Sequence, residues 1–418
     1  MTQAFYTGVS GLKTYSEGIN VASNNLANIS TVGFRAYNAE YSNLFDKALA
    51  TASRGLGNDV GVGVTVSTTS MSQKQGALQI TDRSTDLAIE GDGWFGVEGN
   101  GLSAYTRNGS FGFDSNSDLV TEDGFYVLGT MGNNIKGTTL TSQLDAIPLA
   151  SSASVTKLRF PNTLTYPPVA TTNANFMGNL GTQAGIKTMS ASLIDSQNNK
   201  NNLHLSFQLS ETQTPPGTQW DVTAQVESLD GKTVYSKQTG KVSFDSSGAL
   251  ISTTLTSIDN NGTPVKINLG KNHSGVTATA NVGISASSSS DGTMGGELRG
   301  YDINQNGDVI ATFTNGVQSA VGKVAVFHFQ NDQGLERLDG NKFRESANSG
   351  KAFFVKNKNG ENIIGAHLKN FALESSNATT EDGLTNLIIL QRSYDANSKS
   401  ITTADQMIQK ALNMNAGK

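Results

Sequence analysis

The segment of the chain that most resembles a metal site is the loop DINQNG at residues 302–307. Its side-chain oxygens alternate along the chain as in the first half of an EF-hand calcium loop. The twelfth position of such a loop would be Phe313, where calcium requires a bidentate Glu, and no helix pattern flanks the segment. A glycine-containing β-turn therefore explains the loop better. The same interpretation applies to DSNSD at residues 114–118 and DNNG at residues 259–262.

Residue types that could support catalysis are present but are not grouped. The sequence contains no GxSxG motif, no P-loop and no dinucleotide fingerprint, and GDGWFG at residues 91–96 is typical of a turn followed by a strand. Trp94 and Phe95 are better explained as core residues than as a ligand site. The four histidines are isolated, lack the spacing of zinc ligands and are expected to be structural: His204, His273, His328 and His367. Cysteine is absent as well, so the sequence predicts no catalytic residue, no metal site and no cofactor.

The composition of the chain argues against several kinds of partner. A net charge of −5 leaves no basic footprint for nucleic acid or an acidic membrane. The N-terminal residues show neither the basic region nor the apolar run of a cleaved secretory signal. No apolar run approaches the roughly 20 residues that span a bilayer, so membrane insertion is not expected. Charged residues make up 16% of the chain, against roughly 25% in ordinary globular proteins, which suits turn-rich β domains or a subunit buried against neighbours.

Two long helices are predicted at the ends of the chain, over residues 3–29 and 380–415. In both, apolar residues recur at heptad spacing, which is typical of a coiled-coil seam. The predicted helix–helix assembly residues are Phe5, Leu12, Tyr15, Ile19 and Leu26 in the first helix and Leu387, Tyr394, Asn397, Ile401 and Ile408 in the second. Because the first helix carries few charges, packing on neighbouring chains is favoured over docking on its own domain, although both interpretations stay open.

One antiparallel pair of helices has too little core to be stable alone in water. We therefore expect the chain ends to become ordered only on assembly. A polar Asn on a heptad seam can fix the register of a helix pair. Asn397 is a candidate for that role, and an exposed, register-neutral Asn is the alternative.

At 418 residues the chain is long enough for two or three domains, and the sequence between the helices predicts β structure. Short apolar strands alternate with Gly and Asp turns on both sides of an insert that contains all seven prolines. The expected fold class is mainly β with long α-helical termini and nested, discontinuous domains. The expected domains are a terminal helix domain (1–30 and 376–418), an extended linker region (31–75), an inner β domain (76–138 and 299–375) and an inserted outer β domain (139–298).

Residues 24–35, NNLANISTVGFR, combine turn-forming residues with apolar ones in a way that a plain linker would not need. This motif resembles the axial proteins of bacterial flagella, the rod and hook subunits, in which the pattern ends in a basic residue, commonly Lys, where Arg35 stands here. Similar stretches follow in the expected order: LAIEGDGWFGV, TEDGFYVLG, GDVIATFTNGV with GKVAVFHFQNDQGL, and the C-terminal helix from ATTEDGL to QKAL. They cover both ends of the chain and about half its length.

The resemblance implies a homopolymeric tube of the extracellular flagellum whose terminal helices line the inner wall. It also implies that the segment after the first helix links subunits, through Asn25, Asn28, Thr31, Gly33, Phe34 and Arg35. Distal rod subunits are shorter and lack a large insert, so the hook type is favoured over the distal rod type. A hook-type subunit forms a curved universal joint that transmits motor torque to the filament.

The implied partners are further copies of the chain and the distal rod, hook cap and hook–filament junction proteins. Export would follow the flagellar type III route, without a cleaved signal peptide. From another class, a secreted β-rich adhesin or glycan-active enzyme would explain the Ser, Thr and Asn content. It would not explain two unpaired heptad helices at opposite ends of the chain.

Overall fold

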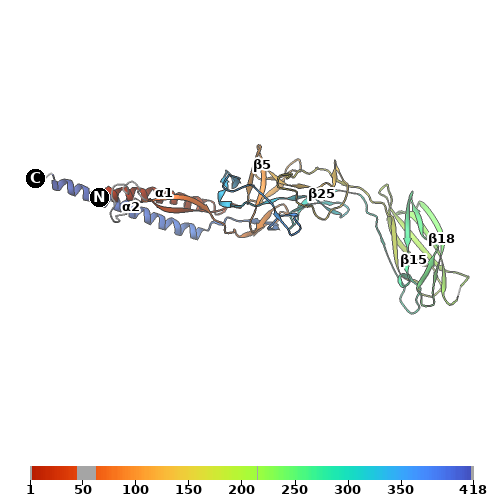
Figure 1. The fold of residues 1–418 in the computed structure, drawn as a ribbon. Coiled ribbons are helices and arrows are strands. Elements are labelled where there is room, and N and C mark those ends of the chain that lie inside the picture. Colours follow the sequence, from red (N-terminus) through yellow and green to blue (C-terminus); the bar gives the residue numbers. More distant parts are fainter. Residues whose placement is uncertain (1, 45–62, 214, 416–418) are drawn as a thin grey trace.

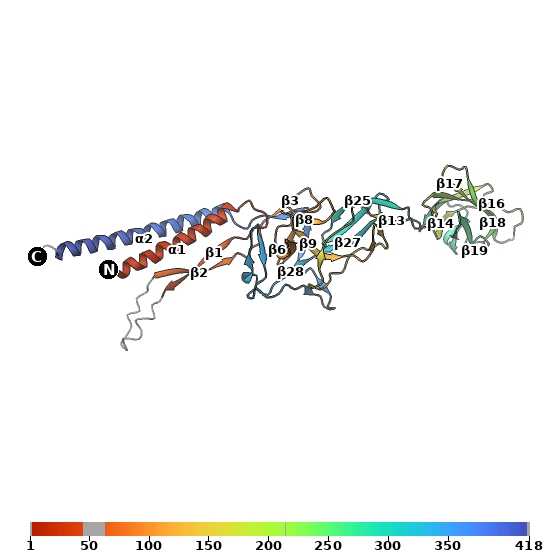
Figure 2. The same cartoon turned by 90° about the horizontal axis from the view of Figure 1, so that it is seen from above.

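The computed structural model describes residues 2–44, 63–213 and 215–415 and shows an elongated molecule. Both ends of the chain lie in a helical region at one end, an inner β domain occupies the middle, and an outer β domain forms the other end (Figure 1 and Figure 2). The predicted fold class, mainly β with long helical termini, is confirmed.

The helical region consists of α1 (Thr2–Ala27) and α2 (Thr380–Asn415), which lie side by side and run antiparallel (Figure 2). α2 begins at a capped turn, because the Thr379 hydroxyl accepts the Asp382 N–H at 3.1 Å. Glu381 and Asp382 in its first turn also complement the helix dipole.

An antiparallel hairpin, β1 (Tyr37–Leu44) and β2 (Gly63–Met71), packs along α1. The Thr14 hydroxyl donates to the Val64 carbonyl at 2.8 Å and fixes β2 against the helix. The region 31–75, expected to be an extended linker, is therefore a hairpin docked on α1 in most of its described part. Residues 45–62 lie outside the described residues.

The inner β domain is built around one large sheet with several short accessory strands. Its elements before the insert are β3 (Leu78–Ile80), β4 (Leu87–Glu90), β5 (Trp94–Gly99), β6 (Leu102–Thr106), β7 (Phe111–Phe113), β8 (Leu119–Thr121), β9 (Tyr126–Met131), β10 (Ile135–Lys136), β11 (Thr139–Leu140), β12 (Thr156–Lys157) and β13 (Thr165–Tyr166). Those after it are β25 (Gly296–Ile303), β26 (Asp308–Phe313), β27 (Gln318–Val324), β28 (Val326–Phe327), η2 (Asp332–Gly334), β29 (Glu336–Arg337), β30 (Lys342–Arg344), β31 (Val355–Lys356), β32 (Asn362–Ile363), β33 (His367–Asn370) and β34 (Ala372–Glu374). β27 pairs with β9, and β28 with β5, so the two flanks of the insert share one sheet.

The outer β domain is a sandwich of two sheets around a common core. Its strands are β14 (Asn173–Asn179), β15 (Lys187–Ile194), β16 (Lys200–Leu209), β17 (Thr218–Ser228), β18 (Val234–Phe244), β19 (Leu250–Thr253), β20 (Ser257–Asn260), β21 (Thr263–Asn268), β22 (Gly270–Lys271), β23 (Ser274–Thr277) and β24 (Ser285–Ser290). Side chains of β16 and β17 alternate between core and surface, with the apolar ones on the core side, as expected for half-buried strands. Trp220, Phe207 and Phe244 fill the space between the sheets.

The insert is shorter than the sequence suggested. β11, β12 and β13 pair within the inner sheet, and Leu140, Leu158 and Phe160 belong to the inner core. The outer domain therefore begins at β14 and ends at β24, not at residues 139 and 298. Pro148 and Pro161 lie in irregular segments beside the inner sheet, and Pro167 and Pro168 lie after β13, in the connection to the outer domain, so none of them interrupts a ladder.

Two chain segments, residues 167–172 and 291–295, form a neck between the two β domains (Figure 1). Val169 and Thr293 exchange backbone hydrogen bonds of 2.8 and 2.9 Å across the neck. The Asp291 carboxylate accepts the N–H groups of Thr172 and Asn173 at 2.8 and 2.9 Å. The neck is thus a narrow, two-stranded connection held at both ends.

Candidate functional site: the helix pair and the turn after α1

Small residues form the face of α1 that lies against α2. A Cβ on Gly8 would lie 2.7 Å from Ile401, and one on Gly11 would lie 2.4 Å from Asn397. One on Gly18 would lie 3.1 Å from Leu390 of α2 and 2.2 Å from the Tyr41 hydroxyl of β1. These glycines allow the two helix backbones to approach closely, in contrast to a heptad seam of large side chains.

The predicted assembly residues lie on and around this seam, and none of them is fully buried. Leu12, Tyr15, Ile19, Leu26, Leu387, Asn397, Ile401 and Ile408 are half-buried, and Phe5 and Tyr394 are exposed. Leu26 packs near Gly383 at one end of the pair, and Ile401 covers Gly8 near the other. The sequence identified the helices and their side-by-side pairing, whereas the glycine stripe that sets their separation was not among its candidate residues.

Large apolar side chains remain exposed along both helices. They are Phe5, Tyr6 and Val9 on α1 and Leu384, Ile388, Ile389, Tyr394, Met407, Leu412 and Met414 on α2. The exposed fractions of Ile388 and Ile389 are each 56%. Soluble monomers seldom expose so many large apolar residues along one element. The helix pair therefore carries an apolar surface that its own chain does not cover within the described residues.

The side chain of Asn397 lies on the seam, next to Gly11. Its amide donates to the Ser393 carbonyl at 2.8 Å, within α2 and not across the pair. An effect of Asn397 on helix register would therefore act through its shape and its fit against glycine, and this role stays a prediction.

Asn25 in the last turn of α1 and Asn28 directly after it form hydrogen bonds that shape the turn. The Asn25 amide donates to the Tyr37 carbonyl at 2.7 Å, and its oxygen accepts the Tyr37 N–H at 3.0 Å, so one side chain fixes the start of β1. The Asn28 amide donates to the Asn24 carbonyl at 2.8 Å, and its oxygen accepts the Thr31 hydroxyl at 3.1 Å. These bonds replace helical ones at the C-terminal end of α1 and explain the amide-rich motif.

Gly33 and Phe34 dock this turn on the inner domain. Gly33 has φ +67°, and a Cβ there would lie 2.5 Å from the backbone nitrogen of Asn108. Phe34 is buried, and the Arg337 guanidinium lies 5.7 Å from the centre of its ring. Only glycine satisfies both the left-handed conformation and the close approach at position 33.

Arg35 is buried and lies 3.0 Å from the Glu374 carboxylate at the end of β34. The sequence placed a basic residue here without indicating its partner. The structure therefore places all six predicted linker residues, from Asn25 to Arg35, at the junction between the helical region and the inner domain.

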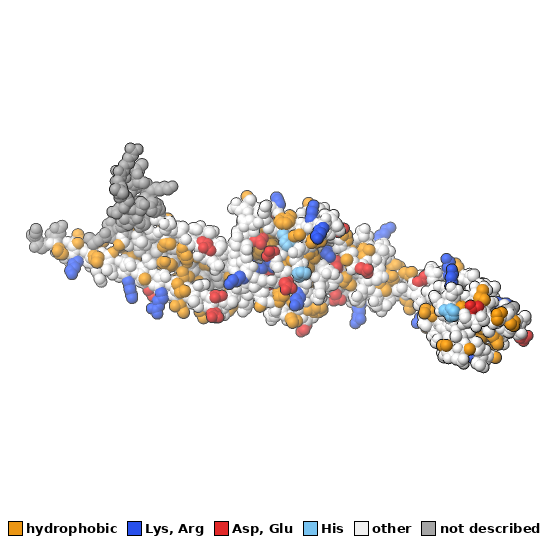
Figure 3. Space-filling model, turned by 60° about the horizontal axis from the view of Figure 1, so that its bottom comes forward, with side chains coloured by type: hydrophobic (Ala, Val, Ile, Leu, Met, Phe, Trp, Pro, Cys, Tyr) orange, Lys and Arg blue, Asp and Glu red, His pale blue; other side chains and the backbone are white. Residues whose placement is uncertain are grey.

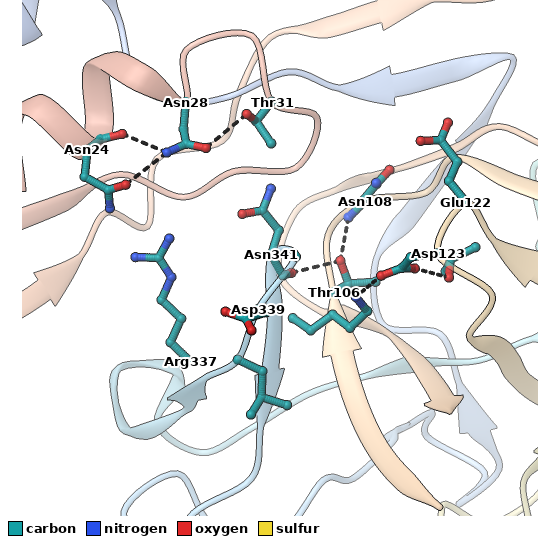
Figure 4. Close-up of a pocket in the computed structure, with 14 residues that line it drawn as sticks. Asn24, Asn28, Thr31, Thr106, Asn108, Glu122, Asp123, Arg337, Asp339 and Asn341 are labelled. Carbon is teal, nitrogen blue, oxygen red and sulfur yellow. Dashed lines mark hydrogen bonds and ion pairs between the residues drawn. The ribbon is translucent and has the colours of Figure 1, made fainter. Parts of the chain in front are cut away.

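A polar groove of about 880 Å³ runs beside this turn (Figure 4). Asn24, Asn28 and Thr31 line it from the turn, and Thr106, Asn108, Asp123, Arg337 and Asn341 are among the residues that line it from the inner domain. Asn341 donates to the Val32 carbonyl at 3.2 Å and accepts the Thr106 hydroxyl at 3.0 Å through its own carbonyl. Asp123 forms an ion pair with Lys342. The groove therefore exposes the predicted linker residues Asn28 and Thr31 next to the inner domain.

The loop that resembles half of a calcium site is a hairpin turn between β25 and β26. The Asn304 side-chain oxygen accepts the N–H groups of Asn306 and Asp308, each at 2.9 Å, and Gly307 has φ +73°. The same pattern recurs at Asp114, whose carboxylate accepts two N–H groups of its own turn. The β-turn interpretation is confirmed at both loops, because backbone N–H groups bond to the Asn304 and Asp114 side chains and close each turn.

The remaining candidate groups have structural partners. His328 is buried and lies 2.7 Å from the Ile364 carbonyl, and the Trp94 indole donates to Asp332 at 3.2 Å within the core. His204 lies between Ser190 and Glu227 on the open face of a sheet. Among the described residues no set of three or more acidic, His or Cys side chains is arranged to hold a metal ion. None of the helices over the described ranges is long and apolar enough to cross a membrane.

Charged side chains are scattered over the surface shown in Figure 3, where no large patch of one sign is visible. The candidate functional surface of this chain is the apolar helix pair together with the amide-rich turn that joins it to the inner domain.

Three family models match separate parts of the chain. "Flagella basal body rod protein" matches residues 5–35, "Flagellar hook protein FlgE/F/G D1 domain" matches residues 88–158, and "Flagellar basal body rod FlgEFG protein C-terminal" matches residues 369–414. The flagellar hook protein FlgE of Escherichia coli K12 is 30% identical over 427 residues, which cover 98% of this chain and 100% of that protein.

The flagellar hook proteins of Borreliella burgdorferi and Salmonella typhimurium are 26% and 28% identical, over 99% and 98% of this chain and 100% of each relative. The crystal structure of Helicobacter pylori flagellar hook protein FlgE2 matches with a TM-score of 0.54 and 17% identity, over 71% of this chain and 100% of that chain. This structural likeness shows a shared fold.

Proposed function

The chain belongs to the bacterial flagellar hook protein family and is a structural subunit of the hook, and we propose that its copies assemble into a curved tube that transmits motor torque to the filament. The observation that supports this function best is the uncovered apolar surface of the helix pair, which includes Ile388 and Ile389. Burying one such side chain contributes about 1.5–3 kcal/mol. Further copies of the same chain can cover this surface when the helix pairs pack together.

The predicted site residues take two roles in this proposal. The half-buried and exposed residues of the helix pair contact other copies. The motif was expected to link subunits, but Gly33, Phe34 and Arg35 are buried within their own chain, and they link the helical region of each copy to its inner domain. The groove beside the turn leaves Asn28 and Thr31 accessible to a neighbouring subunit. We further propose the distal rod, hook cap and hook–filament junction proteins as the partners at the ends of the tube, and export without a cleaved signal peptide.

Limited proteolysis of the purified chain tests the assembly mechanism. In the free subunit, protease should remove the chain up to β3 and from the end of β34 onward, because one helix pair has little core of its own. The same segments should resist protease after polymerisation. Equal protection in the free subunit would mean that the helices dock on their own domain, and the assembly mechanism would then be wrong.

A charged substitution on α2 separates the apolar contact from a general effect on the helix. Ile388→Glu should abolish polymerisation, because it places a charge in the proposed contact. Gln391→Glu introduces the same charge at another exposed position of α2 and should polymerise. Electron microscopy and sedimentation report the outcome, and normal polymers of Ile388→Glu would contradict the proposed contact.

A further inference from the structure

Three chain segments meet where the helical region joins the inner β domain: residues 33–36 after α1, residues 72–76 after β2, and residues 374–377 before α2. Every covalent connection between the two regions passes through these segments. Any bending or twisting load that passes along one subunit between its helices and its β domains must therefore cross this junction.

Backbone hydrogen bonds join the three segments to one another. The Gly33 N–H donates to the Glu374 carbonyl at 2.7 Å, and the Ser72 N–H donates to the Ala36 carbonyl at 2.7 Å. The Asn377 side chain extends this set, since its oxygen accepts the Ala36 N–H at 2.6 Å and its amide donates to the Lys74 carbonyl at 2.7 Å. Each segment is thus bonded to both of the others.

A buried ion cluster lies at the centre of the junction. The Glu374 carboxylate lies 3.0 Å from Arg35 and 3.3 Å from Arg107, and all three side chains are nearly inaccessible, with exposed fractions of 1%, 4% and 4%. The Gly76 N–H also donates to Glu374 at 3.0 Å. One carboxylate therefore bonds groups from the segment after α1, the segment after β2 and the inner domain.

Arg107 extends the cluster into the inner domain. It donates to the Gly91 carbonyl at 2.8 Å, and its guanidinium lies 5.5 Å from the centre of the Trp94 ring. Burial, the larger cause, and the neighbouring Arg35, the second cause, lower the pKa of Arg107 to about 10, so the group is still a cation at neutral pH. Removal of Glu374 would leave two cations facing each other in a space closed to water.

We propose that Glu374 is a positioning residue that couples the helical region to the inner β domain, so that the two move as one body within the hook. This inference rests on the proposed torque-transmitting function. It also assigns a role to Arg35 of this chain: its fork contacts both Glu374 and the Lys74 carbonyl, whereas the Lys that is common at this position would offer a single point of attachment.

Hydrogen exchange on assembled hooks of the full chain tests this coupling. Glu374→Gln keeps the shape of the side chain and removes its charge. We expect faster exchange in the peptides that contain Gly33, Ser72 and Asn377, and unchanged exchange in β5, β9 and β27. A general loss of stability would instead raise exchange throughout the inner sheet.

Asp308→Asn provides the matched control. Asp308 is as buried as Glu374 and lies 3.0 Å from Lys323, but both residues belong to the inner sheet and not to the junction. This variant should raise exchange around β26 and β27 and leave the junction peptides unchanged. Unchanged junction exchange in Glu374→Gln, or an equal rise at the junction in Asp308→Asn, would overturn the proposal.

Arg35→Lys provides a second test of the coupling if subunits with Glu374→Gln do not assemble. It retains the charge and should raise exchange at the same junction peptides, and hooks built from it should bend more readily in measurements of their thermal fluctuation. If neither junction peptide exchange nor bending stiffness changes, the coupling role is wrong. Failure of the unmodified chain to form hooks would instead contradict the proposed function itself, so the two failures are distinguishable.

Discussion

Replacing Gly33 by Ala tests whether the turn after α1 is held against the inner domain by a close backbone contact. A Cβ at this position would lie 2.5 Å from the Asn108 nitrogen and 2.7 Å from the Arg107 carbonyl carbon. Both are backbone atoms, which cannot rotate away as the end of a side chain would. We therefore expect the turn of Gly33→Ala to undock, while the inner domain stays folded.

Three contributions set the free energy by which Gly33→Ala weakens the docking of the turn. The left-handed conformation at Gly33 costs Ala about 1–2 kcal/mol, and the lower entropy of Ala in the open state offsets about 0.4–1 kcal/mol of this. Steric overlap adds about 1–3 kcal/mol. The central expectation is a loss of about 2–3 kcal/mol, which raises the population of the undocked turn about 30- to 150-fold at 25 °C.

Trypsin cleavage after Arg35 measures this population in assembled hooks. Arg35 is buried when the turn is docked, so cleavage requires opening, and its rate follows the open population when the protease is dilute. Gly137→Ala is the control, because Gly137 has a similar φ of +63° and open space around its Cβ position. Wild-type cleavage rates in Gly33→Ala would refute the close contact, and an equal increase in Gly137→Ala would show that the effect is not local.

Three further predictions concern the helix seam and the neck. Gly11→Leu should prevent hook assembly, because even a Cβ at this position would lie 2.4 Å from Asn397. Ser16→Leu, at an exposed position of α1, should still assemble. Electron microscopy of the two variants shows whether hooks form. Asn397→Leu should give heterogeneous polymers through altered helix register, and unchanged polymers would discard that role. Acidification should loosen the neck: partial burial raises the pKa of Asp291, but hydrogen bonds from Asn173 and Thr172 outweigh it and hold that pKa well below its ordinary value. The stability that Asp291 contributes is therefore present above its ordinary pKa of roughly 4 and is lost as the pH falls through its lowered pKa. Amide exchange in the neck should rise at low pH in the wild type. Asp291→Asn should show no such additional rise.

Sequence patterns were sufficient wherever the deciding residues are neighbours along the chain. The turn at residues 302–307 is an example, because the Asn304 oxygen that closes it and the Gly307 conformation that it requires lie within one loop. The two helices are another, since heptad spacing and the acidic first turn of α2 are local features. The family resemblance also rested on contiguous stretches of this kind.

The features that the sequence did not predict depend on contacts between residues far apart in the chain, or on glycines, which have no side chain. A heptad template looks for large apolar residues, and it therefore overlooked the seam formed by Gly8, Gly11 and Gly18. A search for small residues at helical spacing could have found that seam. The partner of Arg107 is Glu374, 267 positions away, and the sequence gives no local sign of their contact. The boundary of the insert was expected at residue 139, but Pro148 and Pro161 still lie beside the inner sheet, and the outer domain begins only after Pro167 and Pro168.

The junction and the neck of this subunit differ in how their chain segments are bonded to one another. At the junction, three segments are bonded to one another around a buried carboxylate, and breaking any one bond leaves the other two segments tied. At the neck, the two segments are joined to each other by a pair of backbone bonds and by the exposed Asp291, where water can replace a bond that breaks, while bonds of Thr171 and Gly295 tie the neck to the outer domain. Deformation should therefore concentrate at the neck, so that the outer domains reorient as a hook bends while the helices and inner domains keep their mutual orientation. If hydrogen exchange in bent and straight hooks changed at the junction and not at the neck, this division of stiffness would be wrong.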